Sequence, residues 1–129
     1  MKKLLLTLFF VLFALPSNAL ELLMAHNPNC GLCQRFIEEV AIDYDESEQA
    51  KYLPLTIINV YEQPQWFIEA YAENRIKHIR ATPTFIVWNG RKELSRLTGY
   101  RDREDFMTRL NIFIEESKLD YVKPLEIEA

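Results

Sequence analysis

The feature that most restricts the folds open to this chain is the order of its apolar segments. A continuous apolar run at 22–24 predicts a buried strand over 21–25, and the segment 53–60, rich in leucine, isoleucine and valine, predicts a second one. Between them, apolar residues recur every three or four positions over 33–44, which is typical of one buried helix face. Because a helix crosses between the two strands, we expect them to lie parallel in one sheet.

A second helix is predicted to begin at Glu62-Gln63-Pro64, because proline is favoured in the first turn of a helix. Its inner face is expected to carry four apolar residues: Trp66, Phe67, Ala70 and Tyr71.

The last part of the chain predicts a hairpin and a final helix. Segments 84–88 and 93–98 flank Asn89-Gly90, a dipeptide that favours a type I′ hairpin turn. Asp102 is expected to cap a helix, and its inner side carries Phe106, Leu110, Phe113 and Ile114. The order β-α-β-α-β-β-α predicts an α/β fold with a mixed four-stranded sheet flanked by helices.

Residues 1–19 have the pattern of a secretory signal peptide. A short basic start precedes an apolar run at 4–15, and small residues stand before the cleavage site expected after Ala19. Twelve helical residues span about 18 Å, which is short of the roughly 30 Å hydrocarbon core, so an uncleaved anchor is disfavoured. We therefore predict a periplasmic protein with no stable membrane insertion after cleavage.

The mature chain is predicted to be one domain, residues 20–129, ending in a short acidic, frayed tail from about residue 122. The full chain has 15 basic and 19 acidic residues. Cleavage removes Lys2 and Lys3, which leaves 13 basic against 19 acidic residues and a net charge of −6. An acidic protein repels phosphate, so nucleic acid is excluded as a partner, and proteins or small molecules are expected.

Cys30 and Cys33 are the only cysteines of the chain. A disulfide that closes so short a loop adds little stability, so chemistry explains the pair better than structure does. The pair lies at the junction of the first strand and first helix, where free N–H groups and the helix dipole stabilise a thiolate. We expect Cys30 to attack a substrate disulfide and Cys33 to resolve the mixed disulfide.

Other interpretations of the pair remain open at this point. It could be half of a zinc site, although only His26 and His78 remain as further ligands. It could bind Cu(I) with help from Met24 or His26, or form an inert bridge. A protonated His26 or the adjacent Arg35 could stabilise the thiolate, whereas His78 is expected to be a surface residue.

A second motif, Arg80-Ala81-Thr82-Pro83-Thr84-Phe85, precedes the predicted strand at 84–88. Its proline cannot donate to the strand ladder. A cis Thr82–Pro83 bond would turn the chain tightly there, and cis peptides occur mostly before proline. The sequence by itself leaves the isomer open.

These motifs resemble the thioredoxin superfamily over roughly 21–117. The features that carry the resemblance are Cys30-Gly31-Leu32-Cys33, Ala81-Thr82-Pro83-Thr84 about fifty residues later, Asn89-Gly90, and Thr98-Gly99 before the last helix. The resemblance implies a thioredoxin-like fold with a cis proline beside the disulfide. It also implies that Thr82, Pro83, Gly31 and Leu32 contact the substrate, and that the Cys30–Cys33 dithiol carries the electrons without a metal or organic cofactor.

The chain departs from thioredoxins at three places. Asn29 replaces a tryptophan, Gly31-Leu32 replaces Gly-Pro, and Met24 stands where a buried acid normally helps to deprotonate the resolving thiol. The short exported form is similar to the periplasmic thioredoxin-like proteins of sulfur-oxidation systems.

The function predicted from these residues is the reduction of protein disulfides in the periplasm. Leu32 lacks the charge with which oxidases of this superfamily stabilise the thiolate, which favours the reductase direction. The resemblance also implies a membrane electron relay as the donor. The alternative is a copper-binding protein or a redox-silent partner module that keeps the fold.

Overall fold

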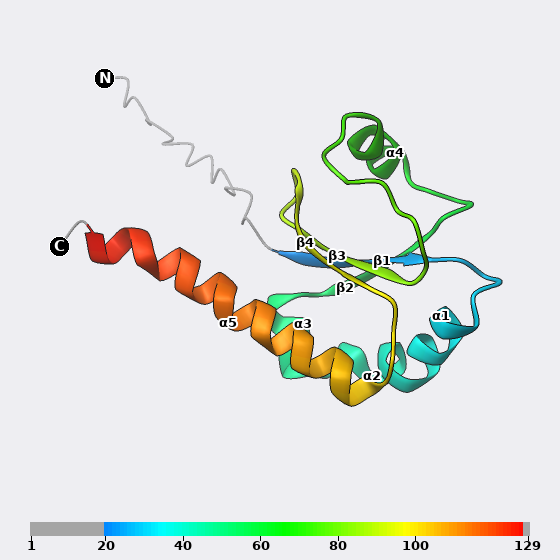
Figure 1. Cartoon of the computed structure of the whole chain (residues 1–129), viewed down its shortest axis with the longest axis horizontal. Coiled ribbons are helices and arrows are strands. Elements are labelled where there is room, and N and C mark those ends of the chain that lie inside the picture. The colour runs from blue at the N-terminus through cyan, green and yellow to red at the C-terminus, as the bar shows by residue number, and fades with distance from the viewer. Residues whose placement is uncertain (1–19, 128–129) are drawn as a thin grey trace, which may run out of the picture.

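The computed structural model describes residues 20–127, with side chains as far as Ser117. The predicted signal peptide and its cleavage site therefore lie outside the described residues. The chain forms an α/β structure in which one sheet lies between two layers of helices (Figure 1). No helix among residues 20–127 combines the length and the apolar character that crossing a membrane requires.

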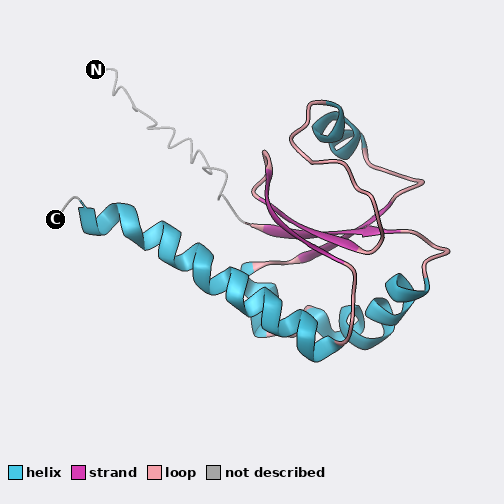
Figure 2. Cartoon of the chain, viewed as in Figure 1, coloured by secondary structure: helices cyan, strands magenta, loops and turns pink. Residues whose placement is uncertain are grey.

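Four strands make up the sheet, in the order β2-β1-β3-β4 (Figure 2). They are β1 (Glu21–His26), β2 (Leu55–Asn59), β3 (Thr84–Trp88) and β4 (Glu93–Thr98). β1 pairs in parallel with β2 and antiparallel with β3, and β3 pairs antiparallel with β4. The predicted mixed four-stranded sheet is thus confirmed, with β1 in its interior.

Helices cover the two faces of the sheet unequally. On one face lie α1 (Gly31–Phe36), the π-helical segment η1 (Ile37–Ala41), α2 (Ile42–Tyr44), α3 (Glu48–Tyr52) and α5 (Arg103–Ile127). On the other lies α4 (Gln65–Ala72) alone (Figure 1). α1, η1 and α2 follow one another without a break, so the predicted first helix is present, with a wider turn in its middle.

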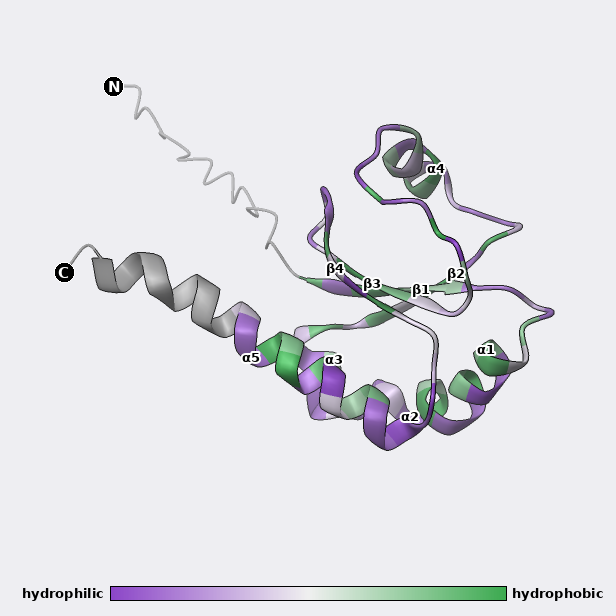
Figure 3. Cartoon of the chain, in the orientation of Figure 1, coloured by the Kyte–Doolittle hydropathy of each residue, from purple (hydrophilic) through white to green (hydrophobic). Residues whose placement is uncertain are grey.

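Apolar side chains of β1 point to both faces, which explains its unbroken apolar run. Leu22 and Met24 belong to the cluster under α1 and α5, while Leu23 belongs to the cluster under α4. Apolar residues accordingly recur along the sheet, whereas apolar and polar residues alternate along the helices (Figure 3). This double burial holds β1 firmly in place, and the loop that follows it carries the two cysteines.

The predicted hairpin is present, but the prediction that its turn is of type I′ is wrong. Trp88 pairs with Glu93, so the loop contains the four residues 89–92. The Asn89 side chain accepts hydrogen bonds from the N–H groups of Arg91 (2.9 Å) and Lys92 (2.8 Å). A type I′ turn needs a positive φ at both central residues, and here Gly90 has one (φ 88°) while Asn89 does not. The asparagine is used for its side-chain oxygen, which closes the turn.

Trp66 was expected on the buried face of α4, but it lies outside the core. Phe67 and Ala70 of α4 are buried and Tyr71 packs against the same cluster, but Trp66 is 38% exposed. Its ring lies against that of Trp88 at the end of β3, with centroids 5.7 Å apart. The helical period places Trp66 at the edge of the apolar stripe, where it covers an end of the sheet.

Two further elements differ from expectation. Helix α3 was not predicted, although Ser47 gives its signal: the Ser47 Oγ accepts a hydrogen bond from the Ala50 N–H at 3.2 Å. Asp102 caps helix α5 as predicted: it directly precedes Arg103, and its Oδ1 accepts a hydrogen bond from the Asp105 N–H at 2.8 Å. The helix continues to Ile127, past the point where a tail was expected, and no glycine after Gly99 is present to end it.

Candidate active site

The loop between β1 and α1 is shaped by Asn27. Its side-chain oxygen accepts a hydrogen bond from the Asn29 N–H at 2.9 Å, and its carbonyl oxygen accepts one from the Cys30 N–H at 3.0 Å. These two bonds close a turn that places Cys30 as the N-cap residue of α1. The predicted position of the cysteine pair at a strand–helix junction is therefore the one observed.

Both cysteines are free thiols, and they differ in exposure. Cys30 is half-buried at the surface, whereas Cys33 is fully buried in the cluster that contains Met24 and Phe36. The Cys33 N–H donates to the Cys30 Sγ at 3.1 Å, so the helix N-terminus offers a donor directly to that sulfur. Only the Cys30 sulfur is placed to meet a second protein.

The surroundings of Cys30 favour its thiolate. Partial desolvation raises the pKa of this thiol, but hydrogen bonds from the side chains of Cys33 and Thr82 and from the backbone of Cys33 and Leu32 outweigh it. The net effect is a pKa below the ordinary value for cysteine. Hydrogen bonds to the charged form are the cause, since no basic side chain contributes to the shift.

Cys33 is shifted in the opposite direction. Burial raises the pKa of its thiol, and the side-chain hydrogen bond with Cys30 raises it further. The backbone N–H of Asn27 and the side chain of Thr82 lower it, but by less. Cys30 therefore ionises more readily than Cys33. Thiol–disulfide exchange requires such a difference, because the attacking sulfur must be a thiolate.

The proline motif lies beside the dithiol, although 52 residues separate Thr82 from Cys30 in the sequence. The Cys30 Sγ, as a thiol, donates to the Thr82 carbonyl oxygen at 3.3 Å. The Thr82–Pro83 bond is cis, and Pro83 is buried. The Gly99 N–H donates to the Pro83 carbonyl at 2.8 Å, which ties this segment to the end of β4.

Gly31 and Leu32, expected to contact substrate, are exposed beside Cys30, and Leu32 is 41% exposed. An apolar side chain open to water next to the accessible sulfur is suited to contact a protein surface. A Cβ added at Gly31 would meet no atom within 4 Å. No close approach therefore demands a glycine at this position.

Two other predicted helpers have different partners. The Arg35 guanidinium donates to Glu39 at 3.1 Å and to the Arg101 carbonyl at 3.3 Å, so it is committed away from the dithiol. His78 is exposed and hydrogen-bonded to the Tyr71 hydroxyl, in agreement with the surface position expected for it.

The remaining two predicted residues are His26, which ends β1, and Met24, which lies within it. The buried His26 Nδ1 has no hydrogen-bond partner among the described residues, so a role for it at the thiolate stays a prediction. Met24 is fully buried in the same apolar cluster as Cys33. A hydrophobic side chain thus fills the place where the resemblance puts a buried acid.

Two contributions to the site were not predicted from the sequence. The Thr82 side chain acts on the pKa of both thiols, and the backbone N–H of Asn27 acts on that of Cys33. A threonine before Pro83 was a visible signal for the first. The second had none, because any residue except proline supplies a backbone N–H.

The fold and this geometry can be compared with solved structures. The periplasmic thioredoxin SoxS from Paracoccus pantotrophus, in its reduced form, is 25% identical, with a TM-score of 0.63 over 76% of this chain and 98% of that one. A thioredoxin from Malassezia sympodialis is 17% identical, with a TM-score of 0.56 over 73% and 76%. A thioredoxin from Thermus thermophilus is 22% identical, with a TM-score of 0.53 over 74% and 73%.

A search of curated proteins gives no match. A family model, the thioredoxin-like domain, matches residues 14–114, which includes the dithiol and the proline motif. The chain belongs to the thioredoxin-like family.

Proposed function

We propose that this protein is a periplasmic thiol–disulfide oxidoreductase that reduces protein disulfides through Cys30 and Cys33. The observation that carries the proposal is the asymmetry of the pair. Cys30 is accessible and its pKa is lowered, while Cys33 is buried and its pKa is raised. A structural disulfide does not require its two thiols to differ in accessibility and pKa, whereas a nucleophile and a resolving thiol do.

The reaction proceeds in two exchanges. The Cys30 thiolate attacks one sulfur of the substrate disulfide, which breaks that bond, forms a mixed disulfide and releases one substrate thiolate. Cys33 then loses its proton and attacks the Cys30 Sγ, which forms the Cys30–Cys33 disulfide and releases the second substrate thiolate. The protons of the two cysteines end on the substrate, and two electrons pass from the dithiol to the substrate.

Thr82, Pro83, Gly31 and Leu32 surround the reacting sulfur and would hold the substrate. The Thr82 carbonyl accepts a hydrogen bond from the Cys30 thiol in the free protein. Once the thiol has become a thiolate or a mixed disulfide, that carbonyl is free to accept an N–H from an extended substrate chain. Leu32, exposed two residues after Cys30, offers an apolar contact.

The proposed cellular location and the proposed direction of electron transfer are supported by different observations. The N-terminal pattern of residues 1–19 and the likeness to a periplasmic thioredoxin support export. The uncharged Leu32 between the cysteines supports the reductase direction. Turnover then needs a donor of two electrons, and a membrane protein dithiol that relays electrons across the membrane would supply them.

The test of the mechanism is a trapping experiment with Cys33→Ser, using Cys30→Ser as the matched control. Cys33→Ser keeps the nucleophile but cannot resolve the mixed disulfide, so it should hold substrate proteins as adducts on non-reducing gels, identified by mass spectrometry. Cys30→Ser should trap none and should abolish disulfide reduction. Equal trapping by both variants, or trapping by neither, would contradict the assignment of roles.

The direction is tested by the reduction potential of the pair in thiol buffers. A value near the roughly −270 mV of thioredoxin supports a reductase, and one near about −120 mV makes the protein an oxidant. A pair that failed to cycle at all would instead favour the copper-binding or redox-silent module, and tight binding of one Cu(I) per reduced pair would decide between those two.

A further inference from the structure

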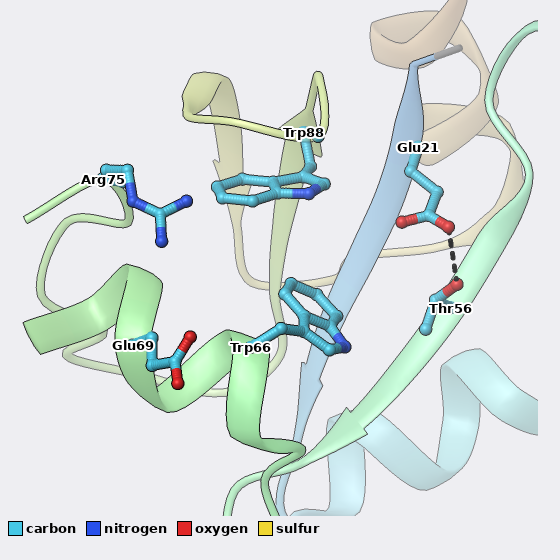
Figure 4. Close-up of a pocket in the computed structure, with 7 residues that line it drawn as sticks. Glu21, Thr56, Trp66, Glu69, Arg75 and Trp88 are labelled. Atoms are coloured by element: carbon cyan, nitrogen blue, oxygen red, sulfur yellow. Dashed lines mark hydrogen bonds between the residues drawn. The ribbon is translucent and has the colours of Figure 1, made fainter. Parts of the chain in front are cut away.

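A cavity of about 360 Å³ opens on the α4 side of the sheet, between α4 and the ends of β1 and β3 (Figure 4). Among the residues that line it are Glu21, Thr56, Trp66, Glu69, Arg75 and Trp88. Glu21 begins β1, whereas His26 ends it and leads into the cysteine loop. Five strand residues at about 3.3 Å each place the cavity roughly 17 Å from that loop. It is therefore distinct from the dithiol site.

Two indole rings form one wall of the cavity. Trp66 and Trp88 are the only tryptophans of the chain, and both line it. Their centroids are 5.7 Å apart and their planes are inclined by 36°. Trp66 is 38% exposed, although the neighbouring Phe67 is buried. A half-open indole beside a cavity offers a π face, which attracts cations and planar groups.

The charges around the cavity are not balanced. Glu21 and Glu69 line it, and no ion pair to either is found among the described residues. The Glu21 carboxylate has only a 3.5 Å contact with the Thr56 hydroxyl, and Glu69 accepts one bond from the neutral Gln65 amide. Both carboxylates thus lack a basic partner among these residues and keep most of their acceptor capacity.

Arg75, the one basic residue that lines the cavity, is already paired. Its Nε donates to Glu73 at 2.8 Å and its Nη1 to the Arg91 carbonyl at 3.0 Å. Its guanidinium carbon lies 5.9 Å from the centroid of the Trp88 ring. Arg75 therefore does not neutralise the two free carboxylates, and its position shows that an indole at this site accepts a guanidinium.

We propose that this cavity binds an organic cation, a guanidinium or alkylammonium group, between the Trp66 ring and the carboxylates of Glu21 and Glu69. An aromatic face and nearby carboxylates are the two features that recognise such a group. A small metal ion would require more oxygen, nitrogen or sulfur ligands, and the described residues contain no cluster of three such side chains. The volume lies in the range of small-ligand sites.

The experiment titrates the full-length protein with Nα-acetyl-arginine methylamide at constant ionic strength, following tryptophan fluorescence. Because both tryptophans line the cavity, the signal reports on this site. We expect saturation with a dissociation constant on the order of 1 mM or lower. The neutral isostere Nα-acetyl-citrulline methylamide should give no saturable change. Equal binding of the two compounds, or no saturation with arginine up to about 20 mM, would overturn the proposal.

Variants locate the site, with affinity measured by calorimetry. Glu69→Gln and Glu21→Gln should each weaken binding about tenfold or more, because each removes a charged acceptor while keeping the shape of the side chain. Glu116→Gln on α5 is the matched control, since Glu116 is exposed and does not line the cavity. Unchanged affinity in both cavity variants would contradict the site.

The source of the cation is distinguished by a second pair of probes. Tighter binding of an arginine inside a blocked tripeptide than of the single residue would indicate a protein side chain. Tighter binding of a free small cation such as choline would indicate a metabolite. Because neither cysteine lines the cavity, the disulfide reductase assay is independent of this result.

Discussion

The two ends of β1 are built on different principles. At the end that leads to the dithiol, backbone atoms lie within hydrogen-bond distance of the Cys30 sulfur: the Cys33 N–H at 3.1 Å and the Thr82 carbonyl at 3.3 Å. At the other end, the cavity is lined by long side chains that reach in from separate elements, as Figure 4 shows.

The support beneath the two ends also differs. Directly under the dithiol, the Phe36 ring packs against those of Phe85, Tyr100 and Phe106, with centroids 4.6 to 5.4 Å apart. At the cavity, Trp66 is 38% exposed to solvent. The reactive end is thus part of the rigid core, while the cavity end is a surface feature that can change without loss of the fold.

The largest expected effect is on stability, and it tests this contrast directly. Phe36→Ala should lower the free energy of unfolding by about 3–5 kcal/mol, because the ring is fully buried among aromatic neighbours. Trp66→Ala should cost about 1 kcal/mol, since the ring is partly exposed already. Urea unfolding monitored by circular dichroism measures both, and equal losses would contradict the contrast.

A smaller effect is expected on the reactivity of the two thiols. Because the pKa of Cys30 is lowered and that of Cys33 is raised, the rate of Cys30 alkylation should reach half its maximum at a lower pH than an ordinary cysteine, and that of Cys33 at a higher pH. Mass spectrometry after iodoacetamide pulses at a series of pH values separates the two sites.

Thr82→Val sharpens the same measurement. Removal of the hydroxyl should raise the pKa of Cys30 and slow its alkylation at neutral pH roughly two- to tenfold, the value of one hydrogen bond. Thr82→Ser keeps the hydroxyl and should restore the rate, and Thr108→Val on α5 controls for the substitution itself. An unchanged Cys30 profile in Thr82→Val would mean that Cys33 and the backbone N–H groups lower the pKa of Cys30 without the Thr82 hydroxyl.

The smallest effect concerns the glycines on either side of the site. Gly31→Ala should stabilise the protein by about 0.4–1 kcal/mol, since a Cβ there meets no atom within 4 Å. Gly99→Ala also meets no atom, but its φ of 83° is strained for alanine, so it should destabilise by about 1–2 kcal/mol. Thermal unfolding compares the pair, and two shifts of the same sign would refute this account.

Much of the fold was predictable because it follows from local pattern. The apolar periods placed the four strands and three of the helices, and the strand order along the chain required β1 and β2 to be parallel. Helix α3 and the π-helical turn of η1 were missed. The first is one short turn with a single cap, and the second differs from an α-helix by too little to change the apolar spacing.

The sequence by itself determined the chemistry of the site: a cysteine pair at the start of a helix, with a proline motif before a buried strand. Only the tertiary structure decided which sulfur is accessible, that Thr82 lies against Cys30 across 52 residues, and that two tryptophans and two carboxylates share one cavity. The physical reason is the distance along the chain between the residues that interact. Helix starts and turns depend on neighbours along the chain, whereas burial, pKa and cavities depend on residues that only folding brings together.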